Sequence, residues 1–385
     1  MSIDRDALVD LTRILVEQPS ENPPGDEAAV ATVLEERLET SLVPFEVERY
    51  EVEPGRPNVV ATAGDPDRGT ILLAGHTDVV PANAADWSGD PYRLHKEGDR
   101  IVGRGTADMK GALVAKLLAA ESYLSEPSAG RVILAFVCDE EHDGIGMRSI
   151  VERGISADCA VIGEPTRLHV CTAQKGVVRY RITVHGKSVH SGTPERGVNA
   201  ITGLDRIVQR LEEFNDERRH ETSHPLLTPE TVTVTRIEGG IAPNVVPDTA
   251  ELLVDWRLLP GSPTDPEQLD RRIDDLVSDL AIDGRLLDVT VDRLVFARGT
   301  EIDPEHEFVN IAVDAAATAG IESETVGFNA ATDARFLIHD GSVPTVLFGP
   351  GSIEEDAHTV DESVCVDDLV STAETYRNLL ESVLD

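Results

Sequence analysis

Hydrophobic and polar positions follow two different patterns in the first half of this 385-residue chain. In some segments apolar residues recur every three or four positions, as on one face of an amphipathic helix. In others they form short unbroken runs rich in β-branched residues, as in strands buried on both faces. Because the two kinds of segment alternate, the pattern predicts an α/β layer around a largely buried sheet. The expected helices are 4–17, 27–40 and 110–124, and the expected strands are 58–64, 70–75, 131–137 and 159–163.

The pattern changes near residue 175, where apolar and polar residues begin to alternate along extended segments. Strands of this kind have one buried and one solvated face. Two helical segments separate them in an order that resembles βαββαβ. After about residue 293 the first pattern returns and ends in a helix at 367–384. The expected strands are 175–186, 231–237, 250–258 and 288–296, and the expected helices are 198–215 and 266–281.

These two patterns predict a two-domain chain of the α/β class. A main α/β domain with a mixed sheet is expected from residues 1–175 and 293–385, and a smaller α+β (βαββαβ) domain is expected as an insertion at 176–292. A chain of 385 residues is also too long for one ordinary core, which favours the same division.

The charge of the chain is strongly negative. It has 34 basic and 71 acidic residues, so the formal net charge is 34 − 71 = −37. Acidic residues are spread along the whole chain, which indicates a globular surface covered in carboxylates, and such a surface repels itself unless salt screens it. We therefore expect a halophilic protein from a salt-rich cytoplasm. Nucleic acid is excluded as a partner because no basic stripe is present to neutralise phosphates.

Cysteine usage and hydropathy also indicate a cytoplasmic location. The four cysteines are scattered and form no C-x-x-C pair, as in intracellular proteins with reduced thiols. Residues 1–18 form an amphipathic helical pattern and lack the basic and apolar regions of a signal peptide. No apolar run approaches the length that spans a bilayer, so no membrane association is expected.

Polar residues that follow strand ends are the candidates for chemistry, because ligands of open α/β sheets gather at the carboxyl ends of strands. His76 and Asp78 follow one apolar strand in "GHTD". Residues two apart on extended chain point to the same side, so Asp78 is expected to hold the far nitrogen of His76. Asp108 stands in "GRGTADMKG" just before a helix, where it is either a metal ligand or a helix N-cap.

The segment "CDEEHDG" (138–144) places three carboxylates after another buried strand. Adjacent residues on extended backbone point in opposite directions, so one of Glu140 and Glu141 is expected to ligate a metal while the other faces a metal-bound water. A solvated acidic turn is the alternative. Glu164 follows a further strand, and His358 lies in a late loop. Two imidazoles with several carboxylates predict a pair of divalent ions such as Zn²⁺ or Co²⁺, about 3.5–4 Å apart.

The motifs also form a recognisable ordered set. "GHTDVVP", "DWSGDPY", "GRGTADMKG", "DEEHDG", "GEPT" and "AHTVDE" follow one another along the chain. Together they resemble the M20 metallopeptidase family, the group of acetylornithine deacetylase, succinyl-diaminopimelate desuccinylase, carboxypeptidase G and aminoacylase. The segments 186–201 and 239–257 resemble the inserted lid and dimerisation domain of that family, so the resemblance covers essentially the whole chain.

The resemblance implies a role for each candidate metal ligand. Asp108 would bridge two divalent ions. His76 and Glu164 would complete one metal site, and Glu141 and His358 would complete the other.

The resemblance also implies catalytic and substrate-binding residues. Asp78 would support His76 from behind, and Glu140 would be the general base. His190, in the insert, would reach across a homodimer to polarise the scissile carbonyl. Asn244 and Arg257 would bind substrate, with Arg257 pairing a substrate carboxylate. A surface ion pair at a strand end is the alternative for Arg257.

The expected reaction is hydrolysis of the amide bond of an N-acyl amino acid or a small peptide. The substrate stays open, because "SIEEDAH" beside His358 is closer to the acetylornithine deacetylase type and "AATDARF" (330–336) is closer to the desuccinylase type. His142 and Asp143 stand where small residues are more usual, which leaves the rim of the site open as well. A non-catalytic relative that only binds amino acids is the alternative, and Glu140 disfavours it because a base has no role in binding. A two-metal phosphoesterase is disfavoured by the negative charge.

Overall fold

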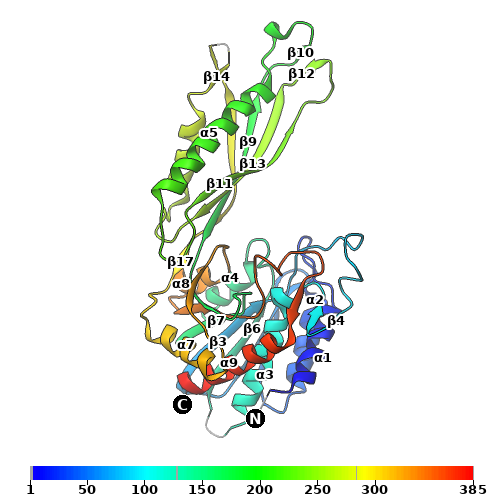
Figure 1. Cartoon of the computed structure of the whole chain (residues 1–385), viewed down its shortest axis with the longest axis vertical. Helices are drawn as coiled ribbons and strands as arrows, with labels where there is room; N and C mark the ends of the chain where they lie inside the picture. The colour runs from blue at the N-terminus through cyan, green and yellow to red at the C-terminus, as the bar shows by residue number, and fades with distance from the viewer. Residues whose placement is uncertain (1–2, 127–128, 283, 385) are drawn as a thin grey trace. The chain divides into compact units, whose positions relative to one another are not determined.

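The structure, a computed structural model, describes residues 3–126, 129–282 and 284–384, and these form two compact units (Figure 1). Unit 1 comprises Met1–Thr172, Ile302–Val326 and Thr332–Asp385, and unit 2 comprises Ala173–Glu301 and Gly327–Ala331. Across these ranges, no helix combines the length and the apolar character needed to cross a membrane.

Unit 1 is built on a mixed sheet whose strands follow the order β1-β2-β6-β3-β7-β19-β8. The central neighbours β6, β3, β7 and β19 are parallel, whereas β1 with β2, β2 with β6 and β19 with β8 are antiparallel. The strands are β1 (Glu46–Glu53), β2 (Arg56–Ala63), β3 (Asp65–His76), β4 (His95–Glu97), β5 (Arg100–Val102), β6 (Gly130–Val137), β7 (Cys159–Ile162), β8 (Val170–Gln174), β18 (Thr325–Phe328), β19 (Thr345–Leu347) and β20 (Ser363–Cys365).

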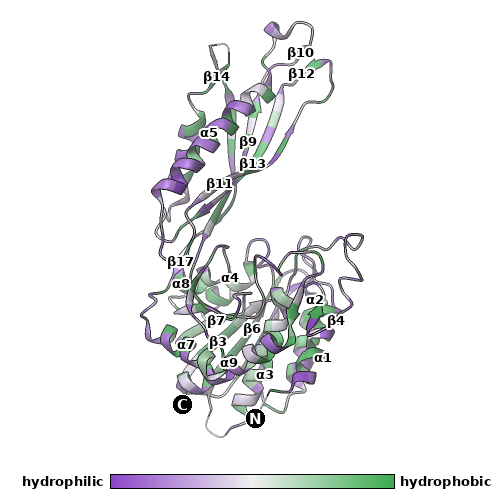
Figure 2. Cartoon of the chain, viewed as in Figure 1, coloured by the Kyte–Doolittle hydropathy of each residue, from purple (hydrophilic) through white to green (hydrophobic). Residues whose placement is uncertain are grey.

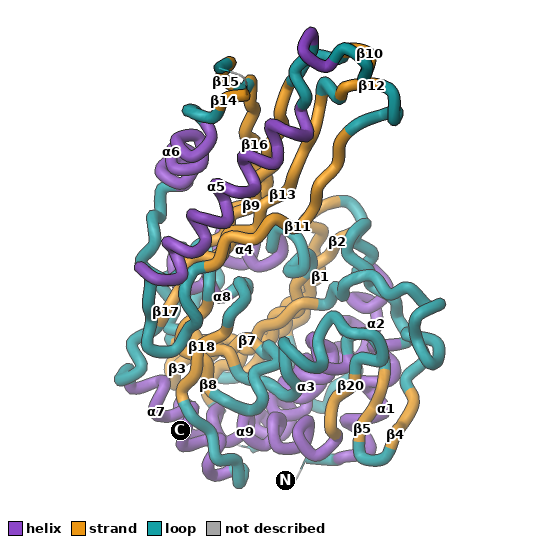
Figure 3. The backbone as a smooth tube through the Cα atoms, turned by 45° about the horizontal axis from the view of Figure 1, so that its top comes forward, coloured by secondary structure: helices purple, strands orange, loops and turns teal. Residues whose placement is uncertain are grey.

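Helices pack on both faces of this sheet (Figure 3). Alternate side chains of β6, such as Val132 and Leu134, join the main hydrophobic core with residues of α1, α2, α3, α7 and α9. The shorter α4 packs against β1 and α8, and α8 packs against β19. The helices of unit 1 are α1 (Arg5–Val16), α2 (Ala28–Glu39), α3 (Gly111–Leu124), α4 (Ile145–Glu152), α7 (Glu307–Thr318), α8 (Ala334–His339) and α9 (Val366–Leu384).

Local sequence accounts for the start of the first helix. Asp4 begins α1 because its carboxylate accepts the N–H groups of Asp6 and Ala7. The helices and strands expected from apolar periodicity are present, each within a few residues of the expected bounds, except that β3 begins at Asp65 and α5 continues to Glu221. β1 has no counterpart among the expected strands.

Unit 2 has the expected βαββαβ order. Its antiparallel sheet runs β11-β13-β9-β16, and α5 and α6 supply the helical residues of its core, where Phe214 meets Trp256 edge to face at 5.1 Å. The outer side of α5 is hydrophilic (Figure 2). The elements are β9 (Gly176–His185), β10 (Val189–His190), α5 (Ala200–Glu221), β11 (Thr231–Gly239), β12 (Val245–Val246), β13 (Thr249–Leu258), α6 (Pro266–Val277), β14 (Ala281–Ile282), β15 (Arg285–Leu286), β16 (Asp288–Ala297) and β17 (Thr300–Glu301).

One face of the sheet in unit 2 is solvated, as the alternating pattern predicts. Arg179 and Arg181 of β9 form ion pairs with Asp255 and Glu251 of the neighbouring β13, at 2.8 and 3.3 Å. Tyr180, which lies between these two arginines on β9, is buried in the core. Period-2 alternation therefore separates the two faces of this sheet.

Candidate metal centre

Three neighbouring parallel strands end at one edge of the sheet in unit 1. β3 ends at His76, directly opposite Val137 at the end of β6, and β7 ends on the other side of β3. Glu164 follows β7 by two residues, and Asp108 enters from the short segment Thr106–Lys110 that precedes α3. The carboxyl ends of these strands therefore bring histidine and carboxylate side chains to the same place.

Five of these side chains form two groups that share one carboxylate. Nε2 of His76 lies 3.1 Å from Oδ1 of Asp108, and Nε2 of His358 lies 3.2 Å from Oδ2. Nε2 of His358 also lies 2.9 Å from Oε1 of Glu141. The first group is His76, Asp108 and Glu164, the second is Asp108, Glu141 and His358, and within each group the candidate ligand atoms lie within 4.8 Å of one another.

The donor set of both groups fits a divalent cation. Each group offers one imidazole nitrogen and two carboxylates, which suits ions such as zinc. Oε1 of Glu164 is buried and has no hydrogen-bond partner within the described part of the chain. A buried carboxylate oxygen without a donor is costly, and a cation in the first group would compensate it.

The structure excludes the two alternatives that involve no metal, namely a helix N-cap for Asp108 and a solvated acidic turn after β6. Asp108 is not a helix N-cap, because α3 begins after Lys110 and has no side-chain cap at its N-terminus. The acidic segment after β6 is not a solvated turn, because the side chains of Asp139 and Glu141 are only 2% and 7% exposed.

The protein alone holds protons where cations would bind. Burial raises the pKa of Glu164 to about 8, and repulsion from Asp108 adds to this rise. Burial by itself would lower the pKa of His358, but hydrogen bonds to Asp108 and Glu141 outweigh it and raise the value to about 11. Cation binding at this cluster is therefore expected to release protons.

Glu140 stands beside both groups without belonging to either. Its backbone N–H donates to Oδ1 of Asp78 at 3.2 Å, and the N–H of Glu141 donates to Oδ2 at 3.1 Å. Burial, followed by the charge of Glu164, raises the pKa of Glu140 well above its ordinary value. Asp78 thus fixes the backbone of two consecutive glutamates, of which Glu141 belongs to the second ligand group and Glu140 belongs to neither.

The contact between Asp78 and His76 differs from the expected one. Nδ1 of His76 lies 2.9 Å from the backbone carbonyl oxygen of Asp78 and 3.7 Å from the carboxylate oxygen Oδ1. The carboxylate is engaged with the N–H groups of Glu140 and Glu141 instead. The main chain of Asp78, and not its side chain, makes the hydrogen bond that fixes the imidazole.

Asp139, the first of the three consecutive carboxylates, turns away from the cluster. Its backbone has φ 70°, and Oδ2 accepts the N–H groups of Asp143 and Ile145. Oδ1 accepts Nδ2 of Asn22 at 3.0 Å and pairs with Arg56 at 2.6 Å. This carboxylate holds the turn together, and it leaves Glu140 and Glu141 to face the site.

Two supporting residues escaped the sequence analysis. Asn22 donates from Nδ2 to both Asp78 and Asp139, and Arg56 pairs with Asp139 and with the buried Glu27. In the sequence Asn22 precedes Pro-Pro-Gly and is indistinguishable from an ordinary turn asparagine. No local signal marks Arg56 either, because its partners are remote along the chain.

The remaining predicted site residues lie in unit 2 and fall into two separate places. His190 and Asn244 are exposed neighbours, since β10 pairs with β12 and the N–H of Ser191 donates to the carbonyl of Asn244 at 3.0 Å. Arg257 lies near the opposite end of β13, where it pairs with Asp255 at 2.6 Å. At roughly 3.3 Å per residue, most of the length of β13, about 30 Å, separates the two places.

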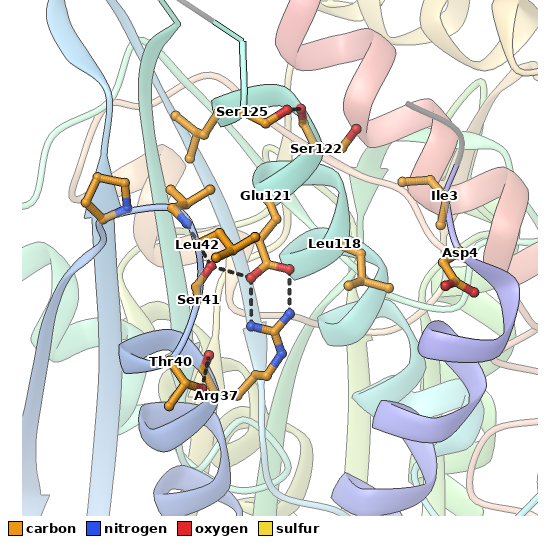
Figure 4. Close-up of a pocket in the computed structure, with 13 residues that line it drawn as sticks. Ile3, Asp4, Arg37, Thr40, Ser41, Leu42, Leu118, Glu121, Ser122 and Ser125 are labelled. Carbon is orange, nitrogen blue, oxygen red and sulfur yellow. Dashed lines mark hydrogen bonds and ion pairs between the residues drawn. The ribbon is translucent and has the colours of Figure 1, made fainter.

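A pocket of about 740 Å³ lies in unit 1 near the C-terminal ends of α2 and α3 (Figure 4). Its polar groups are already paired, because Arg37 donates to both oxygens of Glu121 at 2.7 and 2.6 Å. No predicted site residue lines it. Asp108 precedes the first turn of α3, whereas the residues of α3 that line the pocket begin at Leu118, so the pocket is separate from the cluster. The cluster of histidines and carboxylates is therefore the candidate functional site.

Comparisons with known proteins agree on one family. The model of peptidase family M20/M25/M40 matches residues 72–382. Acetylornithine deacetylase from Vibrio atlanticus (strain LGP32) is 34% identical over 330 residues, which cover 84% of each chain.

Solved structures share the fold. An M20 family metallo-carboxypeptidase from Sulfolobus solfataricus aligns with a TM-score of 0.83 at 20% identity, covering 98% of this chain and 99% of that one. A dinuclear metal-binding peptidase of the M20 family from Bacillus subtilis aligns with a TM-score of 0.69 at 17% identity, covering 99% and 98%.

Proposed function

This chain belongs to peptidase family M20/M25/M40 and is a metal-dependent hydrolase, and from that premise we propose that it removes the acyl group of an N-acyl amino acid of the acetylornithine type. The similarity to acetylornithine deacetylases over most of both chains is the observation that carries this substrate class. The two groups of ligands that share Asp108 support a site for two divalent cations, which we propose to be zinc or cobalt, and one structural neighbour, from Bacillus subtilis, is described as a dinuclear metal-binding peptidase.

The residues of the cluster divide the reaction between them. His76, Asp108 and Glu164 would hold one cation, and Asp108, Glu141 and His358 would hold the other. When bound, such cations lower the pKa of water and polarise a carbonyl group.

Glu140 is the base in this proposal. It takes a proton from the water as the hydroxyl adds to the acyl carbon, and it delivers that proton to the amine nitrogen as the C–N bond breaks. Its raised pKa in the protein alone suits a group that must hold a proton during the reaction, and a bound cation would lower that pKa again.

A panel of substrates tests the activity and its class. The protein, supplied with Co²⁺ or Zn²⁺ in molar salt, is incubated with N-acetylornithine, N-succinyl-diaminopimelate, N-acetyl-leucine and a dipeptide. We expect the highest kcat/KM for N-acetylornithine. Faster cleavage of the dipeptide would make the protein a peptidase, and binding without turnover of any compound would contradict the hydrolase.

We also propose that residues 176–292 form a lid and dimerisation domain and that the protein is a homodimer. β11 is an edge strand of the unit 2 sheet, and among the described residues no strand pairs with its outer side. Ile237 on this strand and Ile241 just after it are 56% and 88% exposed. A second copy would cover both the unpaired strand edge and these apolar side chains.

The positions of His190 and Arg257 support the same arrangement. Since the two residues lie near opposite ends of one sheet, a single copy of unit 2 does not present both to one small substrate. We propose that His190, with Asn244 beside it, acts on the substrate held by the other chain, where Arg257 pairs the substrate carboxylate.

Complementation tests His190 in trans. Chains with His190→Ala and chains with Glu140→Gln are each expected to be inactive. After subunit exchange a mixed dimer contains one site with both groups, so activity returns. Mixed dimers that demonstrably form and stay inactive would place His190 in its own site, and a fully active monomer would contradict the dimer.

A cytoplasmic, salt-adapted location belongs to the same proposal. It is supported by the net charge of −37 and by cysteines that are all free among the described residues.

A further inference from the structure

The buried carboxylate of Glu362 contacts the backbone of Asp108, the ligand that the two groups share. Glu362 is 1% exposed, and its Oε1 accepts the N–H of Ala107 at 2.9 Å and the N–H of Asp108 at 3.0 Å. Its other oxygen, Oε2, accepts Nη1 of Arg104 at 2.6 Å. With both oxygens engaged in this way, Glu362 is not a cation ligand and belongs to neither ligand group.

The local backbone explains why these N–H groups need an outside acceptor. Asp108 has φ −126° and ψ 91°, which is not helical, although it lies just before α3. The helix therefore supplies no acceptor for the N–H of Ala107 or Asp108. Both residues are buried, where an unpaired N–H is costly, and Glu362 satisfies both with one oxygen.

Glu362 is itself fixed from several sides. Its backbone carbonyl accepts the N–H of Gly103 at 2.9 Å. The guanidinium of Arg104 is covered by the ring of Trp87, with 5.2 Å between its carbon and the ring centroid. Ser88 donates from its N–H and its hydroxyl to Asp361 at 3.0 Å, so the segment around Trp87 holds the segment around Glu362.

This arrangement links two parts of the cluster. Glu362 lies four residues after His358, so the same loop supplies one ligand of the second group and the support of the shared ligand. A shift of Glu362 would move the backbone of Asp108, and both groups depend on the carboxylate of Asp108.

We propose that Glu362, held by Arg104, is a positioning residue that fixes the backbone of Asp108 and thereby sets the affinity of both cation sites at once. The inference rests on the two-cation site of the proposed function. It also gives a role to the "DWSGDPY" segment, whose Trp87 and Ser88 hold the Arg104–Glu362 pair in place.

Cation titration of the metal-free protein tests this. Binding of Co²⁺ is measured by calorimetry in molar salt for the wild type and for Glu362→Ala, Glu362→Gln, Arg104→Met and His358→Ala. Glu354→Ala is the matched control, since this exposed glutamate lies on the same loop and its partner is Arg167. Circular dichroism checks that each variant is folded, and the visible spectrum of bound Co²⁺ reports ligand geometry.

The wild type is expected to bind two cations. Glu362→Ala should weaken both binding events, each by about 10–100-fold, the loss typical for a partner that orients a metal ligand. Glu362→Gln keeps an oxygen acceptor for the two N–H groups, so it should lose less than Glu362→Ala while altering the Co²⁺ spectrum. Arg104→Met should weaken both events, His358→Ala mainly one, and Glu354→Ala neither.

Two results would overturn the inference separately from the proposed function. If the wild type binds two cations and Glu362→Ala binds both with affinities within twofold of the wild type, or loses only one, Glu362 does not position the shared ligand. If Glu362→Ala does not fold, wild-type affinities and spectra in both Glu362→Gln and Arg104→Met would overturn the inference in its place. A wild type that binds no Co²⁺ and no Zn²⁺ refutes the two-cation site, and the role of Glu362 with it.

Discussion

Replacing Asn22 with alanine removes one side chain that joins two buried carboxylates. Nδ2 of Asn22 donates to Oδ2 of Asp78 at 2.9 Å and to Oδ1 of Asp139 at 3.0 Å. The three residues are 3%, 0% and 1% exposed, so water does not readily replace the lost donor. Asn22→Ala is therefore expected to destabilise unit 1 and to loosen the turn that carries Glu140 and Glu141.

The size of the effect follows from the number of donors that remain. A hydrogen bond to a charged group contributes about 1.5–3 kcal/mol, so the loss of two such bonds sets an upper range of about 3–6 kcal/mol. Asp78 keeps two backbone N–H donors, and Asp139 keeps Arg56 and two backbone N–H donors. The retained donors place the expected loss at the lower end, about 3 kcal/mol, which is a large part of the roughly 5–15 kcal/mol by which a domain is stable.

Tryptophan placement gives an assay that reports on unit 1 alone. The chain has two tryptophans, of which Trp87 lies in unit 1 and Trp256 in unit 2. In a Trp256→Phe background, urea unfolding of the metal-free protein in molar salt, followed by Trp87 fluorescence, gives the midpoint and slope for unit 1. Asn22→Ala is expected to lower the midpoint at an unchanged slope.

Asn83 supplies the control for this experiment. It also donates from Nδ2 to an aspartate, at 2.8 Å to Asp86, but both residues are exposed. Asn83→Ala should change the unfolding free energy by no more than about 0.5 kcal/mol. If Asn22→Ala changes it equally little, the buried contacts of Asn22 with Asp78 and Asp139 do not hold the turn.

Three further outcomes are expected. Glu140→Gln should abolish turnover while about two cations stay bound, by metal analysis, because Glu140 is the proposed base and not a proposed ligand; a variant stripped of metal would make Glu140 a ligand. The unfolding free energy should rise between dilute buffer and molar salt, because salt screens the net charge of −37; a flat salt dependence would contradict the halophilic interpretation. In the metal-free protein, burial raises the pKa of Glu164 to about 8 and that of Asp333 to about 7. Because both carboxyls hold protons more tightly in the folded state, their contribution to stability is full below about pH 4. Urea unfolding should show that this contribution is lost as the pH rises through 7–8. Bound cations should remove the part of this loss due to Glu164, and equal slopes with and without metal would refute that prediction.

Apolar periodicity was sufficient to predict β2, β3, β6 and β7 and most of the longer helices of this fold, but not β19, α7 or the polar edge of the sheet. β1 has the sequence EVERYEVE, in which none of its residues is buried. An edge strand needs few apolar residues, and on a surface this acidic its alternation is indistinguishable from a solvated charged segment. Short helices such as α8 (Ala334–His339) carry too few positions for a period of 3.6 to show.

The candidate ligands were predictable because each follows a strand end or belongs to a recognisable motif. Their supports were not, because the supporting contacts join residues far apart in sequence. Asn22 reaches Asp139 across 117 positions, and Glu362 reaches Ala107 across 255. Nothing in a local window distinguishes such a residue from any other turn asparagine or loop glutamate, and only the folded chain reveals the donor or acceptor it serves.

Hydrogen-bond donors separate two kinds of buried carboxylate at this site. Those that receive backbone or arginine donors are supports, and those that face only the imidazoles of the cluster, or no donor at all, are the proposed ligands and base. The supports are Asp78, Asp139 and Glu362, and the others are Asp108, Glu140, Glu141 and Glu164.

Asp333 tests this division, because its lack of donors places it with the proposed ligands, yet it belongs to neither ligand group. It is 1% exposed, neither of its oxygens has a hydrogen-bond partner within the described residues, and it joins neither ligand group. A buried carboxylate with no donor and no cation avoids the cost of its charge by holding a proton. Burial accordingly raises the pKa of Asp333 to about 7. Since an asparagine also carries no charge, Asp333→Asn should leave the fold intact near neutral pH, whereas Asp139→Asn should destabilise it by depriving Arg56 of a charged partner.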